Sequence, residues 1–451
     1  MSKLGDHIEY VKGFAFKSKD YTETGIPVIR VSNFTDNSID IKDVYHIPKE
    51  RFSEFQKVNL IKDDIVIATV GSWPTNPSSV VGKTIRVPPE ANNTLLNQNA
   101  VRIRSLDKDE QLYFYYVLKD KSFSDYIIST AQGSANQASI TLKSILDYDL
   151  PNIDSKEKRI KIGETLATYD EKIQLNTLIN QTLEQIAQAL FKSWFVDFDP
   201  VRAKVQALSD GLSLEQAELA AIQAISGKTP EELTALSQTQ PERYTELAET
   251  AKAFPYEMVE VDGVEVPKGW EYCTFGDVSE CFDSKRIPLS KQQREKRKGN
   301  IPYYGATSVM DYVDEAIFDD IYLLIGEDGS VLKEDGTPFT QYIWGKSWVN
   351  NHAHVLKGRN GISTEHLMIF IQQTNISAYI TGAVQLKLNQ KNMNSIPFLK
   401  ANNAINAFFA EYIESLYAKI RKNFDENKVL EATRDLLLPK LLSGNFSNGK
   451  N

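Results

Sequence analysis

A long segment of this chain occurs twice. Residues 172–176 resemble residues 419–423, and the same offset of 247 residues places Asn180 on Asn427 with no gap. Two copies so far apart do not make a repeat array. They indicate a duplicated unit and therefore a molecule with pseudo-twofold internal symmetry.

The repeated segment has the spacing of a helix seam. Its seam positions advance by alternating steps of three and four residues, which predicts a long coiled-coil helix. Asparagines interrupt both copies, and a polar residue in such a seam fixes register and partner. We therefore predict that the two helices pair with each other in antiparallel fashion; two helices packed on separate cores are the alternative. The predicted seam residues are Leu166, Ile173, Asn176, Asn180, Leu183, Leu190, Ile413, Ile420, Asn423, Asn427, Leu430 and Leu437.

A longer segment of mixed pattern precedes each predicted helix. Strand-like stretches at 26–31, 64–70 and 100–104, followed by a helical stretch at 111–118, predict a compact α/β domain. The second segment repeats this plan loosely. The predicted fold class is α+β, with two α/β domains joined by two long antiparallel coiled-coil helices. The predicted boundaries are 1–150 and 266–398 for the globular domains, 151–199 and 399–444 for the helical repeats, 200–265 for an acidic helical insertion or linker, and 445–451 for a tail.

Composition excludes several protein classes. The 451 residues are 41% hydrophobic and 25% charged, which is typical of a globular protein with more than one domain. Cys273 and Cys281 cannot form a disulfide framework and stand at no metal-ligand spacing to a histidine, so we expect reduced thiols in a cytoplasmic protein. No apolar run approaches the roughly 18 residues of a membrane span, and the N-terminus lacks the apolar core of a signal peptide.

The charge is distributed unevenly. The net charge of −9 argues at first against a nucleic-acid partner. Residues 205–262, however, hold 11 acidic and 3 basic side chains, so the rest of the chain is close to neutral. A near-neutral body can carry a basic face, because binding depends on the local potential. A basic run at 285–298 fits such a face and fits a solvated loop equally well.

No catalytic or metal-binding motif stands out. The chain has no glycine-rich phosphate loop, and Asn76-Pro77-Ser78 fails at its third position to match the tetrapeptide with which amino-methyltransferases hold a target base. His352 and His354 lie two residues apart, but such a pair is more often structural than metal-binding. We therefore predict neither a catalytic residue nor a metal site in this chain.

Several polar loops have side chains suited to contacting a nucleic acid. Asn and Gln can read adenine edges, whereas Lys and Arg bind guanine or phosphates. An ordinary surface loop is the alternative for each residue taken singly. The candidate DNA-binding residues are Lys17, Ser72, Trp73, Asn76, Lys83, Arg86, Asn136, Gln137, Lys285, Arg286, Lys333, Trp344 and Lys346.

Several motifs follow one another in a fixed order along the chain. They are Gly13–Ser18 with Gly25–Arg30, Gln137–Ile140 with Leu150–Pro151, Leu175–Asn180, Leu190–Phe198, Pro267–Trp270 and Leu438–Gly444. This ordered set resembles a known family, the DNA-specificity subunits of type I restriction–modification systems. In the second half, Asp283–Pro288 stands where the family's Gly-Phe-Ala-Phe motif is expected.

This resemblance implies a non-catalytic, cytoplasmic subunit used in phage defence. Its two target-recognition domains would each read half of a bipartite site in double-stranded DNA. Its helices, about 60 Å long at roughly 40 residues, would set the spacer and dock two methyltransferase subunits. S-adenosylmethionine, ATP and magnesium would be held by those subunits and by motor–nuclease subunits, not by this chain, and no membrane is involved. A coiled-coil adaptor that does not read DNA remains the alternative, and an enzyme with its own active site is a third hypothesis.

Overall fold

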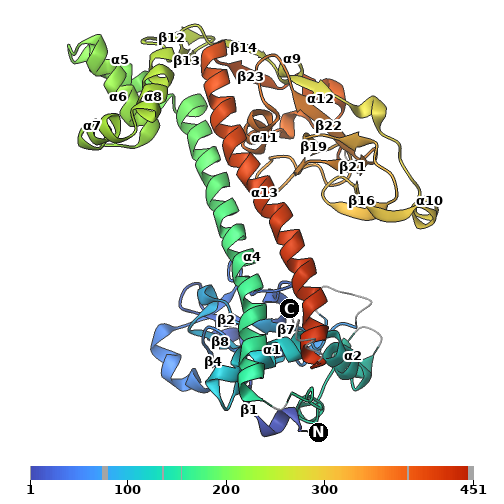
Figure 1. Cartoon of the computed structure of the whole chain (residues 1–451). Helices are drawn as coiled ribbons and strands as arrows, with labels where there is room; N and C mark the ends of the chain where they lie inside the picture. The colour runs from blue at the N-terminus through green and yellow to red at the C-terminus, as the bar shows by residue number, and fades with distance from the viewer. Residues whose placement is uncertain (1, 74–79, 135–136, 154, 383–384, 445–451) are drawn as a thin grey trace, which may run out of the picture. The chain divides into compact units, whose positions relative to one another are not determined.

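The computed structural model describes residues 2–73, 80–134, 137–153, 155–382 and 385–444 (Figure 1). The chain divides into two units, one of Met1–Asn176 with Asp425–Asn451 and one of Thr177–Phe424. Each unit holds one globular domain, called here the first and the second globular domain, and a part of each long helix. Within the described ranges, no helix is long and apolar enough to cross a membrane.

The first globular domain is built on two four-stranded sheets. One sheet has the strand order β1-β9-β5-β7 and is antiparallel throughout; the other has the order β3-β2-β8-β4, with β2 and β8 parallel. A third, small sheet has the order β10-β11-β6. The strands predicted from the sequence are confirmed, and the predicted helix is α1. The elements are β1 Ile8–Lys12, β2 Ile26–Ile29, β3 Tyr45–Ile47, β4 Asn59–Leu60, β5 Ile65–Ala68, β6 Val70–Gly71, β7 Thr84–Arg86, β8 Thr94–Leu96, β9 Ala100–Ser105, α1 Gln111–Lys119, α2 Lys121–Ser129, β10 Gln132–Ser134, β11 Gln137–Ser139 and α3 Leu142–Leu146.

Strand β5 lies at the centre of this domain. All four of its residues are buried, and successive side chains point to opposite faces of a strand. Ile65 and Ile67 pack in the core that contains α1, whereas Val66 and Ala68 pack in the core of the other sheet. An unbroken aliphatic run in the sequence is therefore explained by two cores, one on each face.

The second globular domain has the same strand orders. Its sheets are β15-β22-β19-β20, antiparallel throughout, and β17-β16-β21-β18, with β16 and β21 parallel. A further pair, β14-β23, closes the domain. The elements are β14 Glu271–Thr274, α9 Phe275–Val278, β15 Ser279–Cys281, α10 Lys291–Lys296, β16 Lys298–Tyr304, β17 Val309–Val313, β18 Phe318–Asp319, β19 Tyr322–Gly326, β20 Thr340–Ile343, β21 Lys346–Val349, β22 Ala353–Gly358, α11 Thr364–Gln372, α12 Gln390–Asn394 and β23 Pro397–Lys400.

Smaller features repeat between the two domains as well. Gly5 packs closely against Leu146 of α3, and Gly276 packs against Asn394 of α12. The Thr141 and Asn389 side chains cap the N-termini of these two short helices. The duplicated plan predicted from the sequence is thus confirmed at the level of sheet order and helix capping.

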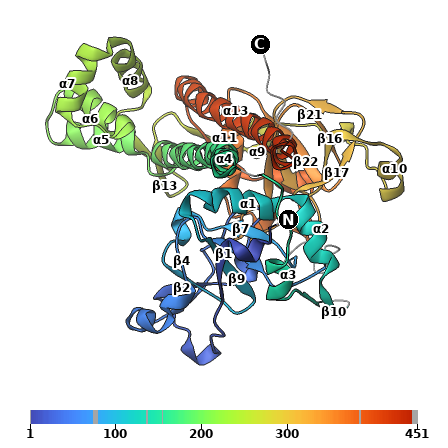
Figure 2. The same ribbon diagram turned by 60° about the horizontal axis from the view of Figure 1, so that its bottom comes forward.

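The two long helices are α4 Lys156–Phe191 and α13 Asn403–Leu442, and they pair in antiparallel fashion in each unit (Figures 1 and 2). In the first unit, Asn176 Nδ2 donates to Asn427 Oδ1 at 2.9 Å, and Asn427 Nδ2 donates to the Ile173 carbonyl at 3.3 Å. In the second unit, Asn423 donates to Asn180 at 2.8 Å, and Asn180 donates to the Ile420 carbonyl at 3.3 Å. The offset of 247 residues converts one pair of bonds into the other.

The remaining predicted seam residues are buried to different degrees. Leu166, Ile413 and Ile420 are buried. The residues Ile173, Leu183, Leu190, Leu430 and Leu437 are half-buried.

Residues 199–267 differ in part from the predicted helical insertion. A π-helical turn, Lys192–Val196, follows α4, and the helices α5 Asp199–Ser209, α6 Leu214–Ser226, α7 Pro230–Thr239 and α8 Pro241–Ala253 come next. The prediction of helix up to residue 265 is wrong at its end, because β12 Met258–Val261 and β13 Val264–Pro267 form a hairpin. Asp262 and Gly263 both have positive φ, and an Asp-Gly pair between alternating apolar residues favours this turn.

Candidate nucleic-acid interface

Three chain segments meet at the end of β5 in the first globular domain. The Thr69 amide donates to the Asn99 carbonyl at 2.8 Å, and the Ile140 amide donates to the Thr69 carbonyl at 2.9 Å. Val70 pairs with Ser139 in the small sheet. Asn99 and Ser139 are exposed, so the sheet edge presents a row of neutral polar side chains.

The hairpin β10–β11 provides part of this row. Gly133 has φ +157°, and a Cβ there would lie 2.0 Å from the Gln137 carbonyl oxygen, so only glycine fits. Trp73 Nε1 donates to the Ser134 carbonyl at 2.8 Å and ties the segment after β6 to the hairpin. Gln137 is exposed on β11.

The second globular domain brings equivalent segments together at the end of β19. The Glu327 amide donates to the His352 carbonyl at 2.8 Å, and the Leu388 amide donates to the Glu327 carbonyl at 2.8 Å. Because Ala68 pairs with Ala100 and Gly326 pairs with Ala353, the two ladders end in register. Thr69, Asn99 and Ser139 therefore correspond to Glu327, His352 and Lys387.

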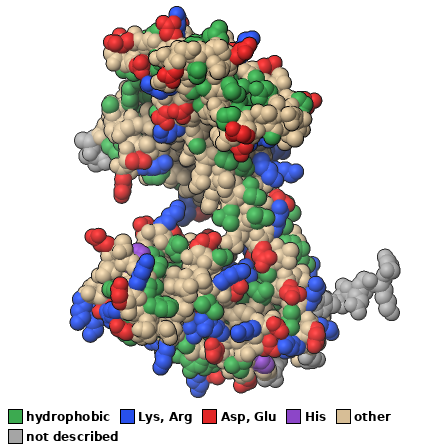
Figure 3. All heavy atoms as spheres, turned by 90° about the vertical axis from the view of Figure 1, so that its left-hand side faces the viewer, with side chains coloured by type: hydrophobic (Ala, Val, Ile, Leu, Met, Phe, Trp, Pro, Cys, Tyr) green, Lys and Arg blue, Asp and Glu red, His purple; other side chains and the backbone are tan. Residues whose placement is uncertain are grey.

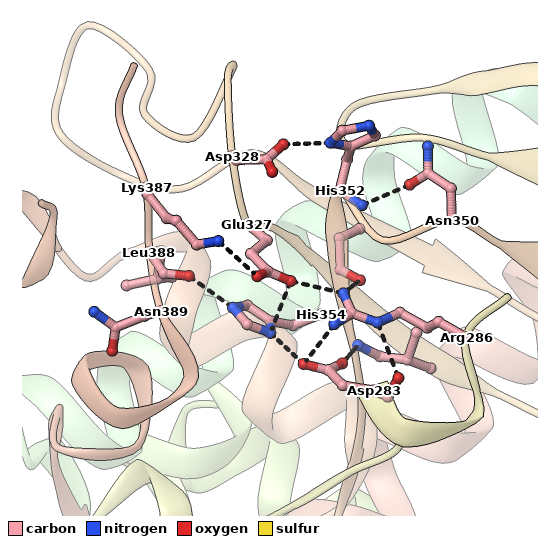
Figure 4. Close-up of polar contacts among 12 residues, drawn as sticks. Asp283, Arg286, Glu327, Asp328, Asn350, His352, His354, Lys387, Leu388 and Asn389 are labelled. Atoms are coloured by element: carbon pink, nitrogen blue, oxygen red, sulfur yellow. Dashed lines mark hydrogen bonds and ion pairs between the residues drawn. The ribbon is translucent and has the colours of Figure 1, made fainter. Parts of the chain in front are cut away.

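At this place the second domain carries an ionic network instead of neutral side chains (Figure 4). Arg286 donates to Glu327 Oε2 at 2.7 Å and to the Ala353 carbonyl at 2.6 Å, and it lies 3.3 Å from Asp283. These three side chains are only 12–14% exposed. Burial alone would raise the pKa of Asp283, but the hydrogen bond from His354 and the nearby charges outweigh it, so this pKa lies below its usual value.

His354 lies at the base of the network. Its Nδ1 lies 2.5 Å from Asp283 Oδ2, and its Nε2 lies 2.8 Å from the Leu388 carbonyl oxygen. A carbonyl oxygen only accepts, so Nε2 must carry a hydrogen. The histidine therefore links β22 to the segment before α12 and holds Asp283 in place.

A surface layer covers this buried network. It consists of Asp328, His352 and Lys387, which Figure 4 shows around Glu327 and Arg286. His352 Nδ1 is hydrogen-bonded to Asp328, and the His352 amide donates to Asn350 Oδ1 at 2.8 Å. Lys387 Nζ lies 3.3 Å from Glu327 Oε1, so it joins the surface layer to the buried one.

The fold also brings Cys281 to a histidine, which the sequence spacing did not indicate. Ligand atoms of Cys281, Asp283 and His354 all lie within 4.8 Å of one another. Asp283 and His354 already hydrogen-bond to each other, Arg286 lies beside them, and burial raises the pKa of the Cys281 thiol to about 12. This arrangement favours a hydrogen-bonded group over a set of metal ligands.

The candidate DNA-binding residues of the first domain fall into three groups. Ser72, Trp73 and Gln137 lie together around the small sheet, with Ser72 buried. Lys83 is ion-paired with Asp36 at 3.3 Å, Arg86 stacks over the Tyr115 ring, and Lys17 is exposed. Asn76 and Asn136 lie outside the described residues.

The candidates of the second domain are dispersed. Lys285 is exposed over the Phe282 ring, whereas the adjacent Arg286 points into the ionic network. Trp344 packs against Tyr342 and against Phe424 of α13. Lys333 and Lys346 are exposed on separate segments.

The basic run at 285–298 is largely neutralised. Arg294 and Lys298 pair with Asp311, and Arg297 pairs with Asp314 and Glu315. On the face drawn in Figure 3, basic and acidic side chains are mixed. Total charge and basic runs are therefore poor guides to a DNA-binding face in this chain.

The residues that sequence reasoning missed are Asp328, His352 and Lys387. A usable signal was present, because residues 96–100 resemble residues 349–353, and that match places His352 on the exposed Asn99. His352 was considered only as a metal ligand. Asp328 is 24 residues away along the chain, so the pairing depends on the fold.

Comparison with known proteins gives a consistent result. The model of the type I restriction modification DNA specificity domain matches residues 1–185 and 267–428. The type I restriction enzyme HindI specificity subunit of Haemophilus influenzae is 42% identical over 362 residues, which are 74% of this chain and 76% of that one. The MjaIX specificity subunit of Methanocaldococcus jannaschii is 22% identical over 361 residues, 74% and 68% of the two chains. The crystal structure of a type I system S subunit from M. genitalium has a similar fold, with a TM-score of 0.52, 18% identity and coverage of 97% and 94%.

Proposed function

Because the chain belongs to the family of type I restriction–modification DNA specificity subunits, we propose that it reads a bipartite DNA site, one half with each globular domain. Membership of this family means sequence-specific DNA recognition, and it does not favour a coiled-coil adaptor. The observation that carries the bipartite proposal is the duplication itself. The two domains share sheet orders and helix caps, yet they present neutral side chains at one loop cluster and ionic side chains at the other. Two domains with the same scaffold and different surface side chains are suited to recognise two different half-sites.

The long helices are proposed to set the spacer between the half-sites and to dock two methyltransferase subunits. Large apolar side chains on their outer faces support docking, because solvent-exposed apolar groups on a helix favour a protein partner. On α13, Val429 and Leu436 line a shallow surface hollow. The exposed apolar residues of the two helices are Leu175, Leu178, Ile186, Phe424, Val429 and Leu436.

The chain is proposed to contribute recognition and no catalytic group. Methyl transfer to adenine would use S-adenosylmethionine on the methyltransferase subunits, and cleavage would use ATP and magnesium on motor–nuclease subunits. The complex would act in the cytoplasm, where it meets both the chromosome and incoming phage DNA.

The test of the function is a comparison of adenine methylation across a genome. The chain is produced together with its methyltransferase subunit in a host without other adenine methylation, and methylated positions are mapped by sequencing. We expect a single bipartite motif with an unread spacer. Methylation of a contiguous motif, or none in a complex shown to assemble on the chain, would contradict the proposal.

The proposed role of the helices has its own test. A matched insertion of seven residues in α4 and in α13 preserves the seam steps and adds about 10 Å to each helix. We expect the unread spacer to lengthen by about three base pairs at roughly 3.4 Å each, with the same bases read in both halves. An unchanged spacer in a methylating complex would refute the idea.

A further inference from the structure

The surface layer of the second globular domain is exposed on one side and packed on the buried network on the other. His352 is 46% exposed and Lys387 is 48% exposed, whereas the supporting Arg286 and His354 are 12% and 1% exposed. The layer is therefore open to a ligand on one side and rigidly supported on the other. A recognition group needs such support, because its side chain must be held in a fixed orientation.

The contacts of His352 fix which of its nitrogen atoms is presented. Nδ1 is taken up by the Asp328 carboxylate. The backbone of His352 is held on both sides, by Asn350 Oδ1 at its amide and by the Glu327 amide at its carbonyl. For this ring, Nε2 is then the atom left for a ligand, and it donates a hydrogen bond when the ring is protonated.

We propose that the Asp328–His352 pair reads a guanine in the half-site assigned to the second globular domain, with Nε2 donating to the O6 acceptor in the major groove. This inference rests on the proposed function. O6 distinguishes guanine from adenine, which carries the N6 donor at the corresponding place in the major groove. Lys387, which is ion-paired with Glu327, lies next to Asp328 in the same surface layer.

The first globular domain supports the assignment of this position. Its counterpart of His352 is Asn99, also exposed and also fixed at its carbonyl by an amide from the end of the central strand. An asparagine side chain matches the N6 and N7 groups of adenine. The same position of the shared scaffold thus holds a side chain suited to guanine in the second domain and one suited to adenine in the first.

The experiment maps adenine methylation by the complex with its methyltransferase subunit, using wild type, His352→Asn and His352→Gln. A control, Lys357→Ala, removes a different ion pair, with Asp320, on β22, the strand that follows His352. We expect one guanine in one half-site to become degenerate in both His352 variants, with roughly tenfold or greater loss of preference. The other half-site, the spacer and the control motif should not change.

The outcomes separate this inference from the function on which it rests. If wild type yields no bipartite motif, the proposed function fails. If wild type yields one and both variants keep it unchanged, the inference is overturned. A variant that weakens duplex binding equally for all sequences, measured with the purified complex, also overturns it, because it identifies His352 as a phosphate contact. Thermal unfolding of each complex verifies that the variants are folded.

Discussion

The two globular domains share their backbone hydrogen bonding at the end of the central strand, and at this place their side chains differ in charge. At the ends of β5 and β19 the same two backbone hydrogen bonds recur, yet Thr69, Asn99 and Ser139 of the first domain correspond to Glu327, His352 and Lys387 of the second. The first set is neutral and needs no support from charge pairs. The second requires Arg286 and His354 beneath it, because buried carboxylates must be paired. A change of surface chemistry has therefore been accompanied by a change in the layer below.

The largest expected effect comes from removing Arg286, the buried charge beneath the loop cluster at the end of β19. Arg286→Met leaves Asp283 and Glu327 without their shared partner, and breaking a buried ion pair costs about 3 kcal/mol or more. Hydrogen–deuterium exchange should show faster exchange in β19 and β22 and no change in β5 and β9. Arg297→Met is the matched control, because its partners are solvent-exposed, and it should cost less than about 1 kcal/mol. An equal loss of protection from exchange in both domains would show that the effect of Arg286 is not confined to the second domain.

A second difference lies in the helix that follows the central sheet of each domain. Tyr113 on α1 and His366 on α11 each occupy the third position of their helix, and both are buried. Burial lowers the pKa of His366 from 6.5 to about 3. Its ring lies among aromatic neighbours such as Phe195 and Phe409, and neither ring nitrogen has a hydrogen-bond partner among the residues that the structure describes. Burial raises the pKa of Tyr113 to about 12, far from this range.

The two helices should therefore respond differently to acid. Between about pH 6.5 and 3 the unfolded chain binds a proton at His366 that the folded chain excludes, so stability falls as the pH falls. At about 1.4 kcal/mol per pH unit, the loss at pH 5 is roughly 2 kcal/mol. His366→Leu should remove this part of the pH dependence, measured as the difference in unfolding free energy between pH 7 and 5. If His366→Leu keeps the wild-type pH dependence of the unfolding free energy, other titratable groups are responsible for that dependence.

The helix pair provides a case in which the two units should behave alike. Asn427→Ala in the first unit and Asn180→Ala in the second each remove two equivalent hydrogen bonds and leave a buried partner amide. Each should cost about 1–3 kcal/mol, and the two costs should agree within about 0.5 kcal/mol. Urea unfolding of the single variants gives the comparison. A large inequality would mean that the repeat preserves the sequence of the seam but not its energetics.

The features that could be predicted from the sequence are those that depend on local periodicity. Steps of three and four residues identified Leu166 and Ile413 as seam positions, because neighbours on a helix surface are close in sequence. The cluster of Ser72, Trp73 and Gln137 was predicted only as separate loops, since its hydrogen bond spans 61 residues. Arg286 was predicted as a DNA contact; its partner Glu327 lies 41 residues away, so the buried network could not be read from the run of basic residues. Side-chain environment in a sheet depends on pairing between distant strands, and a sequence pattern does not report it.

The smallest expected effect concerns exposed lysines, one in each domain. Lys17 and Lys346 are both exposed and were both predicted to contact DNA. A lysine that neutralises one phosphate releases counterions, so replacing either by alanine should lower the slope of log affinity against log salt by about 0.9. Neither change should alter the methylated motif, because phosphate contacts position the protein without reading bases. Duplex binding by the complex at several salt concentrations measures both slopes. If replacing one lysine changes the slope and replacing the other does not, only the domain with the first lysine contacts a DNA phosphate through this side chain. The two domains would then share their scaffold but not their phosphate contacts.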